Sequence, residues 1–88
     1  MYFQVKVRVD IAKLAEFGAK LHNGLLDRSL IRGETFCLAE DPAVGFSVWE
    51  AAGWAAFEAA FSSWRPYYSE VEARELITPA ESMRLLGP

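Results

Sequence analysis

The sequence predicts an α+β fold, in which four antiparallel strands form one sheet and two helices cover a single face of it. Apolar and polar residues alternate with the period of a strand near the N-terminus and again within residues 67–77. In two other stretches, apolar residues recur with the period of a helix. Turn residues between two short apolar runs add a hairpin to the middle of the chain.

The first strand has two chemically different faces. Its apolar side chains come from Phe3, Val5, Val7 and Val9, and its polar side chains come from Gln4, Lys6, Arg8 and Asp10. Because successive side chains of a strand point to opposite faces, we expect one face of the sheet to be apolar and the other polar.

The first helix is predicted at about residues 11–26, with Asp10 as its N-cap. Its apolar stripe, at steps of three and four, consists of Ile11, Leu14, Gly18, Leu21 and Leu25. The next two strands, 31–39 and 43–49, are joined by Glu40, Asp41 and Pro42, so they should form an antiparallel hairpin.

The third strand combines small and large residues. We expect Val44, Phe46 and Val48 to face the helices, and Gly45, Ser47 and Trp49 to lie on the open face. The two small residues would then leave space above the strand. A monomer would leave Trp49 exposed.

The second helix is predicted at 51–64, because its bulky residues share one face, and Pro66 should end it. These residues are Trp54, Phe57, Phe61 and Trp64. Core packing is our interpretation of this stripe, with a cofactor wall as the alternative. A last strand is predicted at 67–77, and Thr78 followed by Pro79 and Glu81 predicts a short terminal helix.

The order of elements is therefore β-α-β-β-α-β with a tail helix, in a single domain spanning residues 1–88. Right-handed crossovers make this the ferredoxin-like arrangement, a four-stranded antiparallel sheet with both helices on one face. The other face must meet water, a ligand or another sheet.

The composition favours self-association. Of the 88 residues, 52% are hydrophobic and 14% are aromatic, which is more than so small a domain can easily bury. The net charge of −3 offers no electrostatic footprint for a nucleic acid or an anionic membrane. A single cysteine favours a reducing, cytoplasmic location, and we see neither a signal peptide nor a membrane span.

Candidate site residues lie on the polar face of the first and last strands. Gln4, Lys6 and Arg8 are expected to orient an anionic group, and Glu70 or Glu72 to move a proton, with Lys6 taking part in catalysis. The alternative is a cross-strand ladder, in which these charges only neutralise one another or a partner's carboxylates.

Trp49 and Tyr68 are expected to line the same site as these charged residues. There they would stack against an unsaturated ring and donate a hydrogen bond. The alternative is that they seal a dimer interface. His22 is interpreted as a partly exposed helix-end residue and Cys37 as an inert packing residue. We predict no metal site and no cofactor.

Several segments resemble a known family. Residues 1–6 look like the opening strand of muconolactone isomerases, small proteins of the dimeric α+β barrel superfamily. Ser47 and Val48, a helix ending in Ser62 and Ser63, and then Pro66 and Tyr67 are similar in order and spacing. Uncharacterised bacterial members are similar as well. The resemblance implies two sheets packed face to face around a small cavity. In the isomerase pattern, a histidine occupies the position of Gln4.

The sequence thus predicts a homodimer or larger oligomer that binds a small organic acid between two sheets. As an enzyme it would be a cofactor-independent isomerase acting on an unsaturated or aromatic acid by proton transfer. The alternatives are a non-catalytic self-associating protein and a cofactor-free monooxygenase of the same superfamily.

Overall fold

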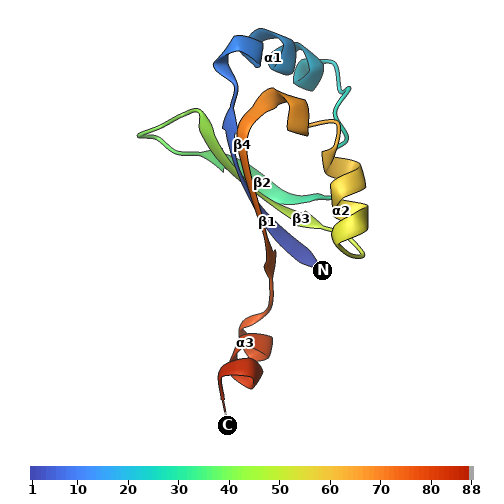
Figure 1. Cartoon of the computed structure of the whole chain (residues 1–88), viewed down its shortest axis with the longest axis vertical. Coiled ribbons are helices and arrows are strands. Elements are labelled where there is room, and N and C mark those ends of the chain that lie inside the picture. The colour runs from blue at the N-terminus through green and yellow to red at the C-terminus, as the bar shows by residue number, and fades with distance from the viewer. Residues whose placement is uncertain (88) are drawn as a thin grey trace.

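A four-stranded antiparallel sheet carries two helices on one of its faces (Figure 1). The structure, a computed structural model, describes residues 1–87. The strands are β1 (Tyr2–Val9), β2 (Ile31–Cys37), β3 (Val44–Glu50) and β4 (Tyr68–Leu76). The helices are α1 (Leu14–His22), α2 (Trp54–Phe61) and α3 (Pro79–Leu86), with short 3-10 turns at Ile11–Lys13 and Arg65–Tyr67. The predicted α+β class and antiparallel sheet are confirmed.

The strand order is β2-β3-β1-β4, with β1 in the centre, as the ferredoxin-like arrangement requires. The hairpin partners β2 and β3 are regularly paired only near their ends. Between Arg32 and Phe36 the register shifts, and Gly33 adopts a positive φ of 72°, which favours glycine. The β2 edge of the sheet is therefore irregular.

The expected orientation of β3 is wrong. Trp49 pairs with Phe3, Ser47 with Val5 and Gly45 with Val7, so these β3 residues share the helix-covered face with the apolar side of β1. Val44, Phe46 and Val48 instead share the open face with the charged side of β1. Alternation fixes which residues lie together on one face of a strand, but a strand with apolar residues on both faces leaves the choice to its neighbours.

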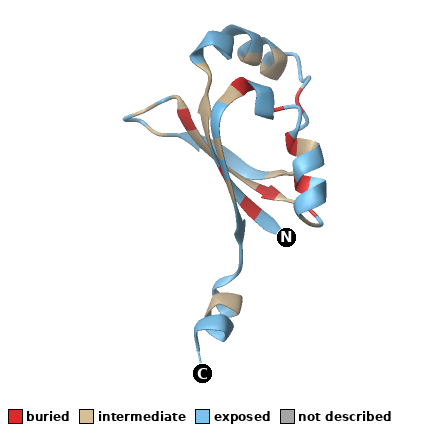
Figure 2. Cartoon of the chain, in the orientation of Figure 1, coloured by how far each residue is buried: buried red, intermediate tan, exposed pale blue. Residues whose placement is uncertain are grey.

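Aromatic side chains fill the core between the sheet and α2. The buried residues lie on the strands and along α2 and the turn after it (Figure 2). Trp49 is only 1% exposed and meets three rings edge-on, those of Phe57, Phe61 and Trp64, at centroid distances of 5.5–5.8 Å. Phe3 stacks on Phe57. The predicted packing role of the α2 stripe is confirmed for the residues after Trp54, which itself stays exposed.

Both central helices are shorter than expected. Gly24, at a φ of 67°, ends α1: its N–H donates to the carbonyl of Leu21, and the N–H of Leu25 donates to the carbonyl of Lys20. This pair of bonds is the Schellman motif. Asp10 caps the preceding turn as predicted, by accepting from the N–H of Ala12. The α2 helix ends at Phe61, before Pro66, which lies in the following 3-10 turn.

The C-terminal helix α3 stands clear of the rest of the chain (Figure 1). It begins where predicted, because the hydroxyl of Thr78 accepts from the N–H of Glu81 and Pro79 occupies the first turn. None of its residues is buried. The body thus consists of the sheet, α1 and α2, and α3 is an arm that continues from β4.

Candidate functional site

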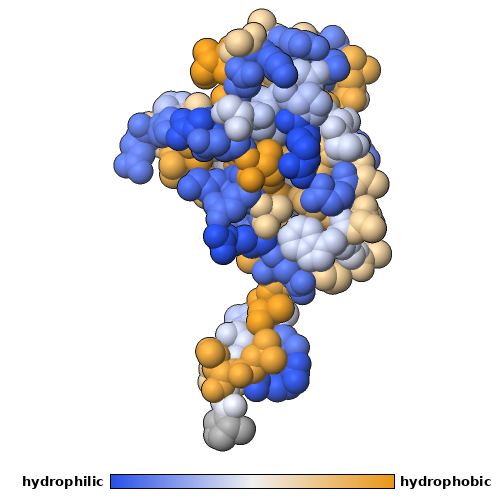
Figure 3. Space-filling view, in the orientation of Figure 1, coloured by the Kyte–Doolittle hydropathy of each residue, from blue (hydrophilic) through white to orange (hydrophobic). Residues whose placement is uncertain are grey.

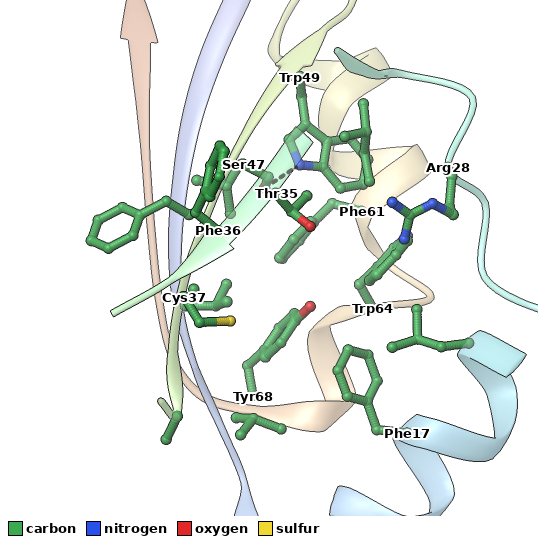
Figure 4. Close-up of a pocket in the computed structure, with 18 of the residues that line it drawn as sticks. Phe17, Arg28, Thr35, Phe36, Cys37, Ser47, Trp49, Phe61, Trp64 and Tyr68 are labelled. Carbon is green, nitrogen blue, oxygen red and sulfur yellow. Dashed lines mark hydrogen bonds between the residues drawn. The ribbon is translucent and has the colours of Figure 1, made fainter. Parts of the chain in front are cut away.

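A cavity of about 270 Å³ lies between the helix-covered face of the sheet, α1 and the β2–β3 hairpin (Figure 4). Its floor is formed by the small residues Gly45 and Ser47 of β3, beside Val5 and Val7 of β1. The predicted space above the small residues of β3 therefore exists, but it opens toward the helices. Since α1 contributes no fully buried residue, the helix closes this side of the core only loosely.

Most of the cavity wall is aromatic or aliphatic. The rings of Phe17, Trp49, Phe61, Trp64 and Tyr68 all face it. Walls of this kind suit a small planar molecule, because a ring can stack on a ring or meet it edge to face.

A few polar groups interrupt the apolar wall. They are the guanidinium of Arg28, the hydroxyls of Thr35, Ser47 and Tyr68, and the thiol of Cys37. The Ser47 hydroxyl already accepts the indole N–H of Trp49 at 2.9 Å. Among the described residues, no aspartate or glutamate lines the cavity. Its only fixed charge is therefore positive, which favours an anionic or oxygen-rich ligand.

The loop that carries Arg28 is tied to the turn that follows α2. The carbonyl of Asp27 accepts the indole N–H of Trp64 at 2.9 Å, and the carboxylate of Asp27 accepts the N–H of Ser29, also at 2.9 Å. Leu26 is buried in the core cluster just before them. These contacts hold Arg28 at the side of the cavity, although it lies in a connection between elements.

Tyr68 is the titratable phenol of the site. Burial raises its pKa to about 12, an effect that the neighbouring Cys37 adds to and the Arg28 guanidinium opposes. The phenol is therefore protonated at neutral pH. It acts as a hydrogen-bond donor aimed into the cavity (Figure 4).

A register shift separates Tyr68 from the charged residues. Arg8 pairs with Glu70, but the next residue of β1, Val9, pairs with Tyr68, so Ser69 is an extra residue in β4. This bulge turns Tyr68 onto the helix-covered face, where it stacks on Phe61. The expectation that Tyr68 shares a face with Glu70 is wrong for this reason.

The open face carries a ladder of ion pairs. Arg8 contacts the carboxylate of Asp41 at 2.8 Å and that of Glu70 at 3.4 Å, and Arg74 pairs with Glu72. The Arg8 guanidinium lowers the pKa of Asp41, and Arg74 lowers the pKa of Glu72. Only the Arg8–Glu70 pair belongs to the cross-strand ladder described as the alternative, since Arg74 and Glu72 both lie in β4 and Asp41 lies between β2 and β3. All of these pairs are at least partly exposed to water.

The predicted site residues are thus divided between two faces. Gln4, Lys6, Arg8, Glu70 and Glu72 lie together on the open face, where four of them, without Gln4, border a shallow hollow of about 140 Å³. Trp49 and Tyr68 lie behind the sheet and border the main cavity. A single site made of all these residues within one chain is therefore wrong, and the individual roles of the five open-face residues stay predictions.

Other sequence-based expectations have different outcomes. His22 is exposed at the last residue of α1, as interpreted. Cys37 is exposed and its thiol borders the cavity, so its expected burial is wrong. Within residues 1–87, no group of acidic, histidine or cysteine side chains is placed to hold a metal ion. None of the helices there has the length and apolarity to cross a membrane.

Sequence reasoning missed Arg28 and Thr35 as cavity residues. Arg28 falls in a polar break between elements, and Thr35 lies in the irregular part of β2. The one sequence signal was the paired small residues Gly45 and Ser47, which predicted the space but on the wrong side of the sheet.

Comparisons place the fold among known structures. The sequence matches no protein-family model and no curated protein. The structure is similar to that of 5-chloro-2-hydroxyhydroquinone dehydrochlorinase from Burkholderia phenoliruptrix in complex with 2,5-dihydroxybenzoquinone. The TM-score is 0.58 at 13% identity, and the match covers 92% of this chain and 98% of that chain.

Two further similar structures are described as antibiotic biosynthesis monooxygenases. One, from Chloroflexus aurantiacus, has a TM-score of 0.43 at 15% identity and covers 88% of this chain and 93% of that chain. The other, from Bordetella bronchiseptica, has a TM-score of 0.47 at 18% identity and covers 88% of this chain and 97% of that chain. The likeness to the dehydrochlorinase supports the ferredoxin-like fold, whereas the specific resemblance to muconolactone isomerases stays a prediction.

Proposed function

We propose that this protein binds a small planar organic acid or phenol in the cavity between its sheet and its helices. One observation carries the proposal: the aromatic wall is interrupted by a cation, Arg28, and by the protonated phenol of Tyr68. A ring would stack against Phe61 and Trp64, while its acidic oxygen would face these two donors. The volume of about 270 Å³ suits a molecule with one ring.

The fold neighbour is consistent with this class of ligand. The dehydrochlorinase structure holds a dihydroxybenzoquinone, which is a planar ring that carries several oxygens. For this chain, the same size and polarity are proposed on the basis of its own cavity.

Catalysis by proton transfer is the finer part of the proposal. Arg28 and Tyr68 would stabilise the negative oxygen of an enolate or phenolate, which is what a cofactor-independent isomerase needs. Glu70 and Glu72, expected to move the proton, lie on the opposite face of the sheet and do not border the cavity of their own chain. Their participation would require a separate site on the open face.

The open face is proposed as the docking surface for a second copy. It combines the apolar side chains of Phe36, Phe46 and Val48 with rows of both positive and negative charge. A face that carries both signs can complement itself across a two-fold axis. Lys6 and Arg8 would then meet carboxylates of the second copy.

Ligand binding can be measured by quenching of tryptophan fluorescence, since Trp49 and Trp64 border the cavity. We expect benzoate, salicylate or gentisate to bind, and Arg28→Gln to weaken this binding about tenfold, which corresponds to about 1.4 kcal/mol. The affinity for benzamide, the neutral counterpart of benzoate, should change little in Arg28→Gln. Arg84→Gln is the matched control, because Arg84 pairs with Glu81 on α3 and does not border the cavity.

A cavity-filling variant tests the location of the site. A Cβ at Gly45 would make ordinary contacts of 3.6–3.7 Å with Cys37, Phe36 and Val7, so Gly45→Ala should fold and its methyl group should occupy part of the cavity floor. Binding should then be weakened. If Gly45→Ala binds the ligand as the parent does while Lys6→Gln or Glu70→Gln does not, the ligand lies on the open face and the proposal is overturned.

Turnover is tested separately. Exchange of a carbon-bound proton of an unsaturated acid with D₂O, followed by NMR, would indicate proton transfer. Oxygen consumption with an electron-rich phenol and no exchange would favour the monooxygenase alternative.

A further inference from the structure

The arm formed by Ile77 and α3 has the features of a helix that is made to dock. Its N-terminus is capped by Thr78, and at its C-terminus the N–H of Gly87 donates to the carbonyl of Met83 at 2.9 Å. Arg84 pairs with Glu81 one turn away. An isolated helix of only eight residues is nevertheless unstable in water, so α3 needs packing partners to persist.

The described part of the chain gives the arm no such partners. No residue of α3 belongs to the core cluster, and none is buried. Met83 is 70% exposed and Leu86 is 81% exposed. Figure 3 shows the hydrophobic residues of the arm gathered on its surface, away from the body.

One side of α3 is an apolar stripe. Pro79, Met83 and Leu86 follow one another at steps of four and three, which places them on the same side of a helix. Ile77 precedes the stripe and is exposed as well. Leu85 points elsewhere, since residues two positions apart do not face the same way.

This apolar surface continues onto the open face of the sheet. Leu76, the last residue of β4, pairs with Tyr2, and both are exposed on the same face as Lys6 and Arg74. Two unpartnered surfaces of one chain therefore adjoin: the open face and the arm. A copy related by a two-fold axis supplies both surfaces in return, so each arm and each open face would be covered at once.

We infer that α3 is a docking arm that packs its Pro79–Met83–Leu86 stripe against a second copy of this chain. The inference rests on the proposed pairing of the open faces and adds the element that fastens the pair. The body is small, and its charged face offers only partly exposed ion pairs. Exposed ion pairs of this kind contribute little to binding free energy, so the apolar arm would supply much of the affinity between the two copies.

The test is sedimentation velocity on the full chain, on one double variant and on one single variant that serves as its control. Met83→Asp with Leu86→Asp places charge on the stripe, and Leu85→Asp makes the same kind of change on another side of α3. We expect the full chain and Leu85→Asp to be dimeric, and the double variant to dissociate at least about tenfold more readily. Near-ultraviolet circular dichroism of the buried aromatic side chains checks that the body is still folded.

The possible results distinguish the docking arm from the proposed pairing of open faces, on which it rests. If the full chain is dimeric and the double variant is equally so, the docking arm is overturned but the pairing of open faces survives. If the full chain is monomeric at every concentration, both are overturned. A chain ending at Ile77 provides a second measurement, because it lacks α3 yet keeps every buried residue of the body; it should behave as the double variant does.

Discussion

At the scale of single residues, Tyr68 has the most informative environment. It reaches the cavity because Ser69 is an extra residue in β4, and its burial keeps the phenol protonated. The unfolded chain loses the proton of this phenol at a lower pH than the folded chain does. Alkaline pH therefore lowers the free energy of unfolding.

The resulting prediction is a loss of stability at high pH. The pKa of Tyr68 is about 12 in the folded chain, compared with 10.0 for an unperturbed tyrosine. The contribution of the protonated Tyr68 to the free energy of unfolding is therefore complete below pH 10 and disappears as the pH rises toward 12. Tyr68→Phe should remove this part of the decline. Urea denaturation along a pH series measures it, with Tyr2→Phe as the control at an exposed tyrosine.

A second residue prediction concerns acid. The Arg8 guanidinium, 2.8 Å away, lowers the pKa of Asp41, so this pair stabilises the fold above the usual aspartate pKa and stops doing so as the pH falls through the lowered value. Arg8→Ala should return the Asp41 pKa toward its ordinary range, as followed by NMR of the carboxyl carbon. Arg32→Ala, which removes a pair with Glu50 instead, should leave Asp41 unchanged.

The alternation of residues predicted which side chains of a strand lie together better than it predicted which face of the sheet they occupy. Alternation correctly placed Gln4, Lys6 and Arg8 together, and it correctly separated Gly45, Ser47 and Trp49 from Val44, Phe46 and Val48. It could not say which of the two β3 sets meets the helices, because both are partly apolar. That decision comes from the pairing with β1, where Phe3 and Val5 oppose Trp49 and Ser47.

At the scale of elements, helix ends were the least predictable feature. The apolar period predicted that the first helix continues to about residue 26, but Gly24 ends it and redirects the chain. As a result Leu26 is 5% exposed in the core, whereas Leu25 is 66% exposed. The signal was present in the sequence as an Asn-Gly pair after His22.

These adjacent leucines allow a matched test. Leu26→Ala should lower the free energy of unfolding by about 2–5 kcal/mol, because it empties a packed core position. Leu25→Ala should change it by no more than about 0.5 kcal/mol. Urea denaturation gives both values, and similar losses for the two variants would mean that α1 extends to Leu25 after all.

At the scale of the whole molecule, the sequence predicted the order of elements, the ferredoxin-like topology and the surplus of apolar surface. It did not predict the cavity's position, which depends on how far α1 stands from the sheet and on a loop held by Asp27 and Trp64. Contacts between residues far apart in sequence determine both, and local patterns carry no record of them.

The exposed apolar surface leads to one further expectation. If two copies pair through the open face, the melting temperature should rise with protein concentration, because association stabilises only the folded state. Calorimetry over about a hundredfold range of concentration measures this. Glu72→Arg, which reverses a charge on the open face, should reduce the dependence; a melting temperature that never varies would contradict the pairing.

The irregular β2 strand has a consequence for how far such assembly can grow. An edge strand with an unbroken row of free N–H and carbonyl groups is a template on which strands of other copies can add without end. Here the shifted register and the left-handed Gly33 interrupt that row at the outer rim of the sheet. The chain is thereby protected against the addition of further strands at this rim, which is the β2 edge of the sheet.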